Sequence, residues 1–79
     1  MKYAGISRFS LVPGAESPLD RHEDAEVWFI ASGQGTIVRG GTEVIHVGAG
    51  DVVNFAPEIS HTLRNTGDQP IVVFSVWWT

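Results

Sequence analysis

A pattern of acid, histidine and acid leads directly into an apolar segment early in the chain. Asp20, His22 and Glu26 stand at even spacing, and the apolar run 27–31 follows. In an extended strand alternate side chains share one face, so all three would share the face of Trp28, which reads as a core residue. We therefore expect the strand to carry Glu26 inward, with His22 beside it at the mouth.

Burial of Glu26 creates a need for positive charge. A buried carboxylate without a charge partner is costly, and no Lys or Arg stands at a matching position on this strand. His61 follows a proline turn, and a strand that begins there could aim its imidazole into the same cavity. Imidazole and carboxylate are ordinary ligands of divalent transition metals, so these residue types indicate a metal site.

The elements that must position these residues read as strands. Turn signals rich in Gly, Pro, Asn and Asp recur roughly every eight to twelve residues, separated by short segments rich in Val, Ile, Phe, Trp and Thr. No long segment has a helical period, so the pattern predicts an all-β fold, a small antiparallel β-barrel. We expect a hairpin through Gly40 and Gly41, a second strand pair, and a long final strand. The expected strands are 35–39 with 42–47, 51–55 with 61–65, and 71–78.

Size and charge exclude several classes of protein. The chain has 79 residues, no cysteine and a formal net charge of −4. We expect one domain over residues 1–79, without disulfides or thiolate metal sites. The basic residues are scattered, so no nucleic-acid partner is expected. No apolar run approaches the ~18 residues of a membrane span, so a cytoplasmic protein without a membrane partner is expected. A chain this short buries only about 60–65% of its unfolded surface, which favours support from a metal or a second subunit.

The first stretch resembles the first motif of the cupin superfamily of small β-barrels. Gly14, His22, Glu26 and Gly33 match the family in residue type and spacing. Asp20 is the departure, because it stands where the family has the first histidine of a His-x-His pair.

A second stretch resembles the second cupin motif. Gly50, His61 and Asn65 match it in type and spacing. Ala56 replaces the proline of that motif, and Glu58 replaces its glycine. The Glu58 replacement is expected to change the turn geometry and to put a carboxylate near the rim of the pocket.

The resemblance spans residues 14–70 and implies a barrel of the cupin, or jelly-roll, type. It places the family's four metal ligands on Asp20, His22, Glu26 and His61. If Asp20 ligates, two histidines and two carboxylates form a site that is neutral with a divalent ion. If it does not, the other three form the two-histidine, one-carboxylate set associated with non-haem Fe(II). One divalent first-row ion is expected: Fe, Mn, Zn, Ni or Cu.

Two functions from different classes follow from the resemblance. The first is a metal-dependent enzyme, an oxidoreductase or an isomerase or lyase, that acts on a small organic molecule as a dioxygenase, isomerase, cyclase or decarboxylase. His22, Glu26 and His61 then hold the metal, Asp20 and Glu26 are the candidate catalytic residues, and Trp28 lines the substrate pocket. The alternative is a non-catalytic domain that binds a small molecule or serves as an accessory to other domains.

The end of the chain predicts a homodimer. Trp77 and Trp78 are adjacent, so they face opposite sides of a strand, and one barrel interior cannot hide both. Exposed apolar surface of this kind rarely stays uncovered. Cupin-like proteins commonly pair by sheet packing or by exchange of the N-terminal strand, here residues 3–12, so the resemblance implies one of these two arrangements.

Overall fold

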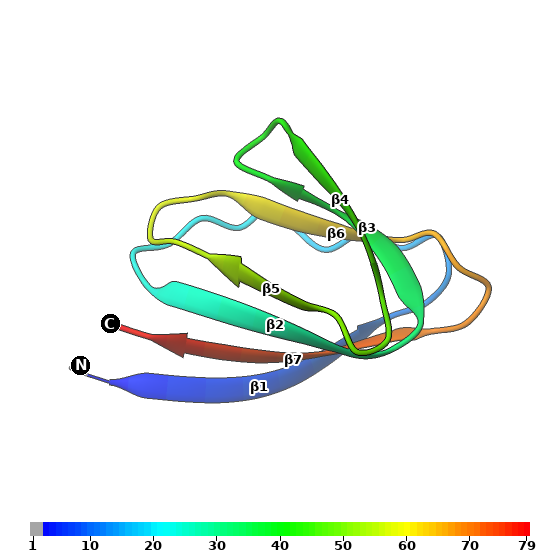
Figure 1. Cartoon of the computed structure of the whole chain (residues 1–79), viewed down its shortest axis with the longest axis horizontal. Coiled ribbons are helices and arrows are strands. Elements are labelled where there is room, and N and C mark those ends of the chain that lie inside the picture. Colours follow the sequence, from blue (N-terminus) through cyan, green and yellow to red (C-terminus); the bar gives the residue numbers. More distant parts are fainter. Residues whose placement is uncertain (1–2) are drawn as a thin grey trace.

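The structure, a computed structural model, describes residues 3–79 and consists of β-strands joined by turns and loops (Figure 1). No helix in this part of the chain is long and apolar enough to cross a membrane. The strands are β1 (Ala4–Leu11), β2 (Ala25–Ser32), β3 (Gln34–Arg39), β4 (Glu43–Gly48), β5 (Val52–Phe55), β6 (His61–Asn65) and β7 (Ile71–Trp78).

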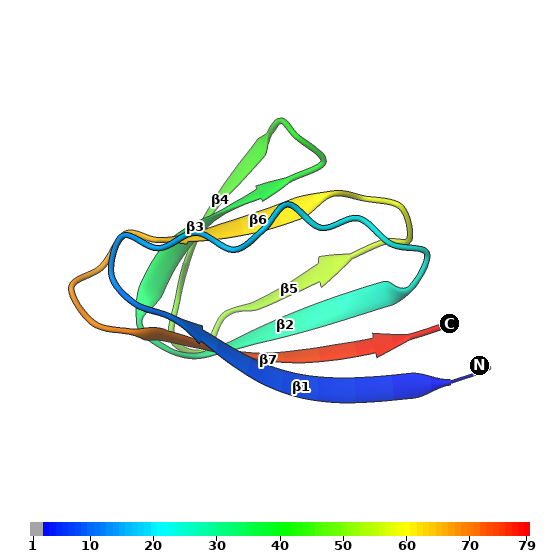
Figure 2. The same cartoon turned by 180° about the vertical axis from the view of Figure 1, so that it is seen from behind.

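The strands form two antiparallel sheets that face each other. One has four strands in the order β1-β7-β2-β5, and the other has three in the order β4-β3-β6. Figures 1 and 2 show the two layers from opposite sides, with both chain ends at the same end of the molecule. The predicted all-β antiparallel fold of the jelly-roll type is confirmed.

The core lies between the sheets and follows the two-residue period of the strands. Trp28 and Ile30 of β2 and Val73 of β7 point inward from one sheet, and Ile37 and Leu63 point inward from the other. Full burial of each large aliphatic or aromatic side chain contributes about 1.5–3 kcal/mol. The packed layers thus give the candidate site a rigid frame.

The expected hairpin is confirmed, and the second expected strand pair is wrong. β3 and β4 join through Gly40 and Gly41, whose φ values of 66° and 81° suit glycine. β5, however, pairs with β2, and β6 pairs with β3, so the connection through Pro57 crosses from one sheet to the other. Val53 and Leu63 are both buried in the core from opposite layers. A proline turn marks a change of direction, but it does not tell a hairpin from a crossover.

The expectation of a strand continuous from Asp20 is wrong as well, because β2 begins only at Ala25. Residues 14–20, here called the edge segment, run beside β6 and are followed by the loop into β2 (Figure 2). The chain therefore changes layers between Asp20 and Ala25. The side chains that were expected to share one strand face come instead from both layers of the fold.

A proline explains why the edge segment is not a regular strand. Pro18 has no N–H to donate, which interrupts a ladder of backbone hydrogen bonds. The neighbouring Ser17 compensates, because its N–H donates to the Leu63 carbonyl and its hydroxyl accepts the Leu63 N–H, both at 2.8 Å. Period-two alternation in the sequence cannot detect a partner of this kind.

Glu58 carries backbone strain that a substitution can release. Among residues 3–79 it is the one non-glycine residue with positive φ, at 68°. A left-handed conformation costs an ordinary residue about 1–2 kcal/mol. Its carboxylate lies 3.3 Å from Arg21 Nε in an exposed pair, and Glu58 is not among the residues that line the cavity described below. The changed turn expected from this replacement is therefore seen as strain, and the carboxylate expected at the pocket rim is engaged with Arg21.

Glu58→Gly is expected to raise the free energy of unfolding by about 0.5–1 kcal/mol. Release of the strain is partly offset by the flexibility of glycine in the unfolded chain and by the loss of an exposed ion pair. Chemical denaturation of the purified variant measures this change. Glu58→Ala keeps the strain and loses the ion pair, so it serves as the matched control and should be no more stable than wild type. A glycine variant less stable than the alanine variant would contradict the strain.

Candidate metal centre

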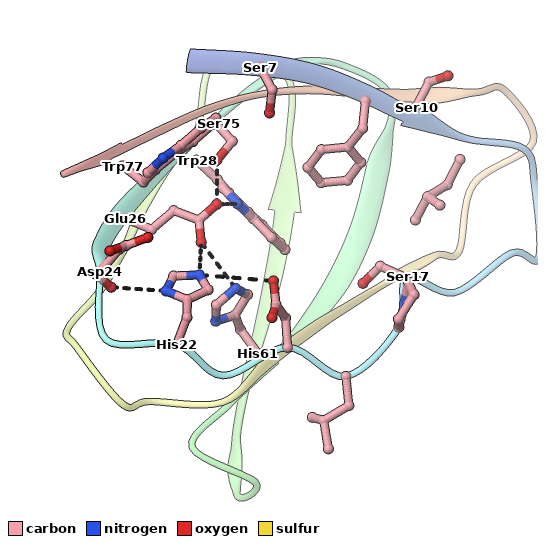
Figure 3. Close-up of a pocket in the computed structure, with 15 residues that line it drawn as sticks. Ser7, Ser10, Ser17, His22, Asp24, Glu26, Trp28, His61, Ser75 and Trp77 are labelled. Carbon is pink, nitrogen blue, oxygen red and sulfur yellow. Dashed lines mark hydrogen bonds and ion pairs between the residues drawn. The ribbon is translucent and has the colours of Figure 1, made fainter. Parts of the chain in front are cut away.

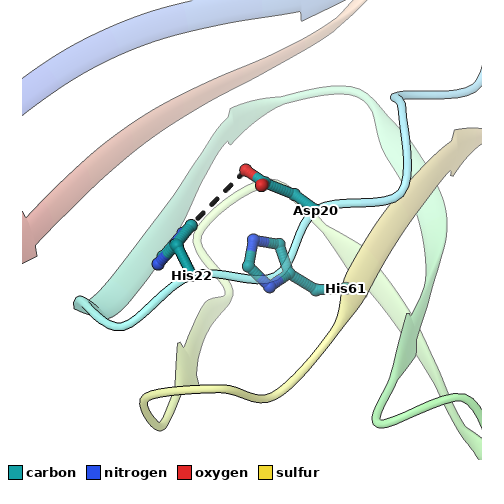
Figure 4. A group of neighbouring side chains, drawn as sticks. All are labelled: Asp20, His22 and His61. Atoms are coloured by element: carbon teal, nitrogen blue, oxygen red, sulfur yellow. Dashed lines mark ion pairs between the residues drawn. The ribbon is translucent and has the colours of Figure 1, made fainter.

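Backbone pairing brings Asp20 and His61 side by side. The Asp20 N–H donates to the His61 carbonyl at 3.1 Å, and the His61 N–H donates to the Asp20 carbonyl at 2.9 Å. His22 follows Asp20 on the loop that crosses to β2 (Figure 4). Glu26 approaches from β2 in the opposite sheet. The two motifs therefore meet across the core and not along one strand.

All four predicted ligand side chains come together. One ligand atom each of Asp20, His22 and His61 lie within 4.8 Å of one another. Glu26 Oε1 lies 2.8 Å from His22 Nε2 and 3.2 Å from His61 Nε2 (Figure 3). The burial of these side chains increases inward, from the exposed Asp20 through His22 to the buried Glu26 and His61.

Backbone carbonyl groups set the tautomer of both histidines. His22 Nδ1 lies 3.1 Å from the Asp24 carbonyl oxygen, and His61 Nδ1 lies 3.1 Å from that of Ile59. A carbonyl oxygen only accepts, so each Nδ1 carries a hydrogen and donates it. In a neutral ring the lone pair is then at Nε2. Both Nε2 atoms face Glu26 Oε1, and electron pairs would repel there unless a proton or a metal cation lies among them.

Two hydrogen-bond donors hold the other oxygen of Glu26. Its Oε2 accepts the indole N–H of Trp28 at 2.8 Å and the hydroxyl of Ser75. Burial raises the pKa of Glu26, but the close contacts with His61 and His22 and the hydrogen bonds from Ser75 and Trp28 outweigh burial and bring the pKa to about 2. Glu26 therefore stays ionised, with Oε1 directed at the two imidazoles.

The pKa of His61 moves in the opposite direction. Burial lowers it, but the close contact with Glu26, the hydrogen bond to the Ile59 carbonyl and the nearby carboxylate charges outweigh burial and raise it. Without a metal, the site therefore retains a proton on His61 to higher pH than an ordinary histidine would. A metal and that proton compete for the same place.

The surroundings of His61 Nε2 indicate whether the site fits a metal. The residue is 1% exposed, and within the described residues Nε2 has no well-aligned hydrogen-bond partner, although Glu26 Oε1 is near. An unsatisfied buried polar atom costs about 1–3 kcal/mol, and a bound cation would relieve that cost. Two imidazole nitrogens and a carboxylate suit Fe, Mn, Zn, Ni or Cu. The residues present fit a divalent metal.

Two supporting contacts were not predicted. Trp28 was expected to line the pocket, and it does, but its N–H also orients Glu26. Ser75 was missed altogether. The sequence did contain an indication of its role. Ser75 carries the one side-chain hydroxyl within the apolar strand 71–78, and strand alternation places it on the inward face with Val73.

A cavity of about 680 Å³ extends from the four side chains between the sheets (Figure 3). Its walls include the apolar side chains of Phe9, Leu11, Trp28 and Trp77. Trp77 fits there because β1 has Gly5 opposite it, where a Cβ would come within 2.3 Å of the indole. Cavities of this size and character are typical of small-molecule sites.

Comparison with known proteins gives consistent matches. A family model described as a cupin domain matches residues 7–77. A protein from Thermotoga maritima, described as a predicted oxalate decarboxylase, is 29% identical with a TM-score of 0.85, over 91% of this chain and 63% of that one. A Cupin 2 conserved barrel domain protein from Salinispora arenicola is 29% identical with a TM-score of 0.87, over 96% and 63%. A cupin protein from Bacteroides fragilis is 30% identical with a TM-score of 0.86, over 98% and 66%. The chain thus spans about two thirds of the length of these proteins.

Proposed function

The chain belongs to the cupin domain family, and from that membership we propose that it binds one divalent first-row transition metal inside the barrel and acts with it on a small organic molecule. The observation that carries the proposal is His61 Nε2, a buried imidazole nitrogen without a well-aligned partner that faces an ionised carboxylate. The reaction belongs to the oxidoreductase or the isomerase and lyase classes.

His22, Glu26 and His61 would hold the metal, with Asp20 as the fourth ligand. When bound, such an ion supplies a Lewis acid that polarises an oxygen of the substrate. Trp28 and Ser75 fix the Glu26 carboxylate, so the metal meets a ligand that is already oriented.

The two candidate catalytic carboxylates receive different roles. Glu26 has a pKa of about 2 and both oxygens engaged, which makes it a ligand and a poor proton acceptor. Asp20 has a side chain that is 62% exposed, and one of its oxygens is 3.9 Å from His22 Nε2. We assign to Asp20 the movement of protons between the substrate and solvent, in addition to any contact with the metal.

Metal content tests the proposal. The purified protein should carry near one equivalent of metal per chain by mass spectrometry of the elements, and chelation should lower its melting temperature, because the metal binds the native state. Turnover of a small molecule that disappears with the metal supports the enzyme. Binding of the molecule without turnover supports the accessory domain instead. Wild-type protein with no affinity for any of the five metals refutes the site.

Asp20→Asn is expected to weaken metal binding roughly tenfold, about 1.4 kcal/mol, with the fold intact. Asparagine is nearly the same shape, so the change removes a charged oxygen ligand without disturbing the pairing with β6. Calorimetric titration with Zn²⁺ and Mn²⁺ measures the affinity. Asp68→Asn, on the loop between β6 and β7, is the matched control and should bind as wild type does.

Equal affinity of Asp20→Asn and wild type would leave the three-residue set as the metal site. Asp20→His, which restores the residue found in the family motif, should keep or raise the affinity and shift the preference toward Zn, Ni or Cu.

A further inference from the structure

The charge of the cavity wall is one-sided. Three acids line it, Asp20, Asp24 and Glu26, and no Lys or Arg among residues 3–79 does. Arg21 is next to this wall in sequence, but it turns away to Glu58, whose carbonyl accepts its Nε–H at 2.9 Å. The described part of the chain therefore offers no guanidinium or ammonium group to pair with an anionic ligand.

A bound metal does not reverse this charge. A divalent ion offsets two of the three carboxylates, so one negative charge is left whichever of them contact the ion. Asp24 is the acid outside the proposed ligand set. Because the cavity lies between apolar layers, that charge is screened less than it would be in bulk water.

Asp24 makes two hydrogen bonds at the wall. Its Oδ1 accepts the hydroxyl of Tyr3 at 2.8 Å, and its backbone carbonyl accepts Nδ1–H of His22 at 3.1 Å. The exposed hydrogen bond from Tyr3 orients the carboxylate, while the backbone carbonyl of Asp24 supports His22. Figure 3 shows Asp24 and Trp77 at the same end of the cavity as Glu26, which agrees with the pairing of Trp77 with Glu26 in the sheet.

The remaining walls suit an organic cation or a neutral molecule. Phe9, Trp28 and Trp77 present aromatic groups, and aromatic faces attract cations as well as apolar groups. The hydroxyls of Ser7 and Ser17 can exchange hydrogen bonds with a neutral polar group.

We propose that the cavity selects small organic molecules that are positively charged or neutral, protonated amines above all, that it rejects carboxylates, and that Asp24 sets this preference. The inference rests on the proposed function insofar as the selected molecule shares the cavity with the metal.

Three probes of similar size test the selection at pH 7.5: benzylamine as the cation, benzyl alcohol as the neutral molecule and benzoate as the anion. Each is titrated into zinc-loaded and into metal-free protein, and the indole N–H signal of Trp28 is followed by NMR. Benzylamine should bind the zinc-loaded protein about tenfold or more tightly than benzoate. The difference should be larger in the metal-free protein, where no divalent ion offsets the acids.

Asp24→Asn tests whether Asp24 sets the preference of the cavity for cations. It keeps the backbone carbonyl that supports His22 and removes only the charge. Benzylamine affinity should fall roughly threefold to tenfold, and benzyl alcohol affinity should stay the same. Glu23→Gln makes the same change on the exposed neighbour, which does not line the cavity, and should alter neither affinity.

Benzoate that binds the zinc-loaded protein as tightly as benzylamine overturns the selection, and so does a lack of binding by all three probes. Benzylamine affinity unchanged in Asp24→Asn overturns the role of Asp24. Failure of the protein to take up zinc or any of the other four metals refutes the proposed function but not this inference, because the order of the probes in metal-free protein still tests the charge of the cavity.

Discussion

Replacing His61 by alanine should abolish stoichiometric metal binding, with affinity reduced by about a hundredfold or more. Changes in groups that only support a ligand already cost 10–100-fold, so the loss of a buried ligand should reach at least the upper end of that range. Elemental analysis and zinc titration measure the loss. The increase in melting temperature that metal gives the wild type should disappear with it.

The alanine variant also loses packing, so a second variant is needed. The His61 ring stacks on Phe55 with centroids 4.3 Å apart and packs edge-to-face against Trp28 at 5.1 Å. Truncation there leaves a void that costs about 2–4 kcal/mol. His61→Phe keeps the volume and the stacking but has no nitrogen, so it should fold and still fail to bind metal.

A histidine elsewhere supplies the control for this experiment. His46 lies exposed on β4, where Nδ1 is 3.2 Å from the Thr36 hydroxyl. His46→Ala should keep the wild-type metal content. If a folded His61→Phe also keeps near one metal per chain, the ligand assignment is wrong.

Phe74→Arg should convert a homodimer into a monomer. The outward face of the four-stranded sheet carries one apolar row across three strands, in which Phe74 pairs with Phe29 and Phe29 pairs with Val52. These three side chains are 39%, 44% and 58% exposed. A neighbouring row joins Ile6 of β1 to Val76 of β7. We propose that two copies pack these faces together, because an apolar patch that spans four strands rarely remains in water.

An arginine at the centre of such an interface should raise the dissociation constant by about a hundredfold or more, about 2.7 kcal/mol, since it buries an unpaired charge. Light scattering and sedimentation velocity at micromolar concentration measure the mass of wild type and variant. Val44→Arg, on the exposed outer side of β4 in the other sheet, is the matched control and should stay dimeric. A monomeric wild type at these concentrations would exclude the dimer, and a dimeric Phe74→Arg would place the interface on another face.

Local patterns predicted the elements of the fold better than the partners of each strand. The glycine pair at Gly40 and the apolar run that became β7 identified a hairpin and a strand correctly, because turn chemistry and alternation act over a few residues. The wrong pairing of residues 51–55 with 61–65 concerned which layer each strand joins. That choice depends on how Val53 and Leu63 meet across the core, and no local pattern records it.

The candidate site, like the fold, was predicted from the sequence only in part. The spacing within the two motifs identified Asp20, His22, Glu26 and His61, and the structure brings all four together. Strand alternation gave the wrong reason for their proximity, since Asp20 pairs with β6 and Glu26 lies on β2 in the other sheet. The contact of Ser75 with Glu26 joins residues far apart in sequence, so it could be found only after the sheet order was known.

The attachment of the edge segment to β6 has a consequence for how fast a metal could enter or leave. The segment is held by backbone hydrogen bonds at Gly14, Ala15, Ser17 and Asp20, with Pro18 interrupting the series. If these bonds open together, Asp20 and the following His22 move away while Glu26 and His61 stay in their sheets. Such local opening requires less free energy than unfolding of the whole domain. The lifetime of a bound ion would then follow the protection of these few amide hydrogens from exchange with solvent, and not the global stability of the barrel.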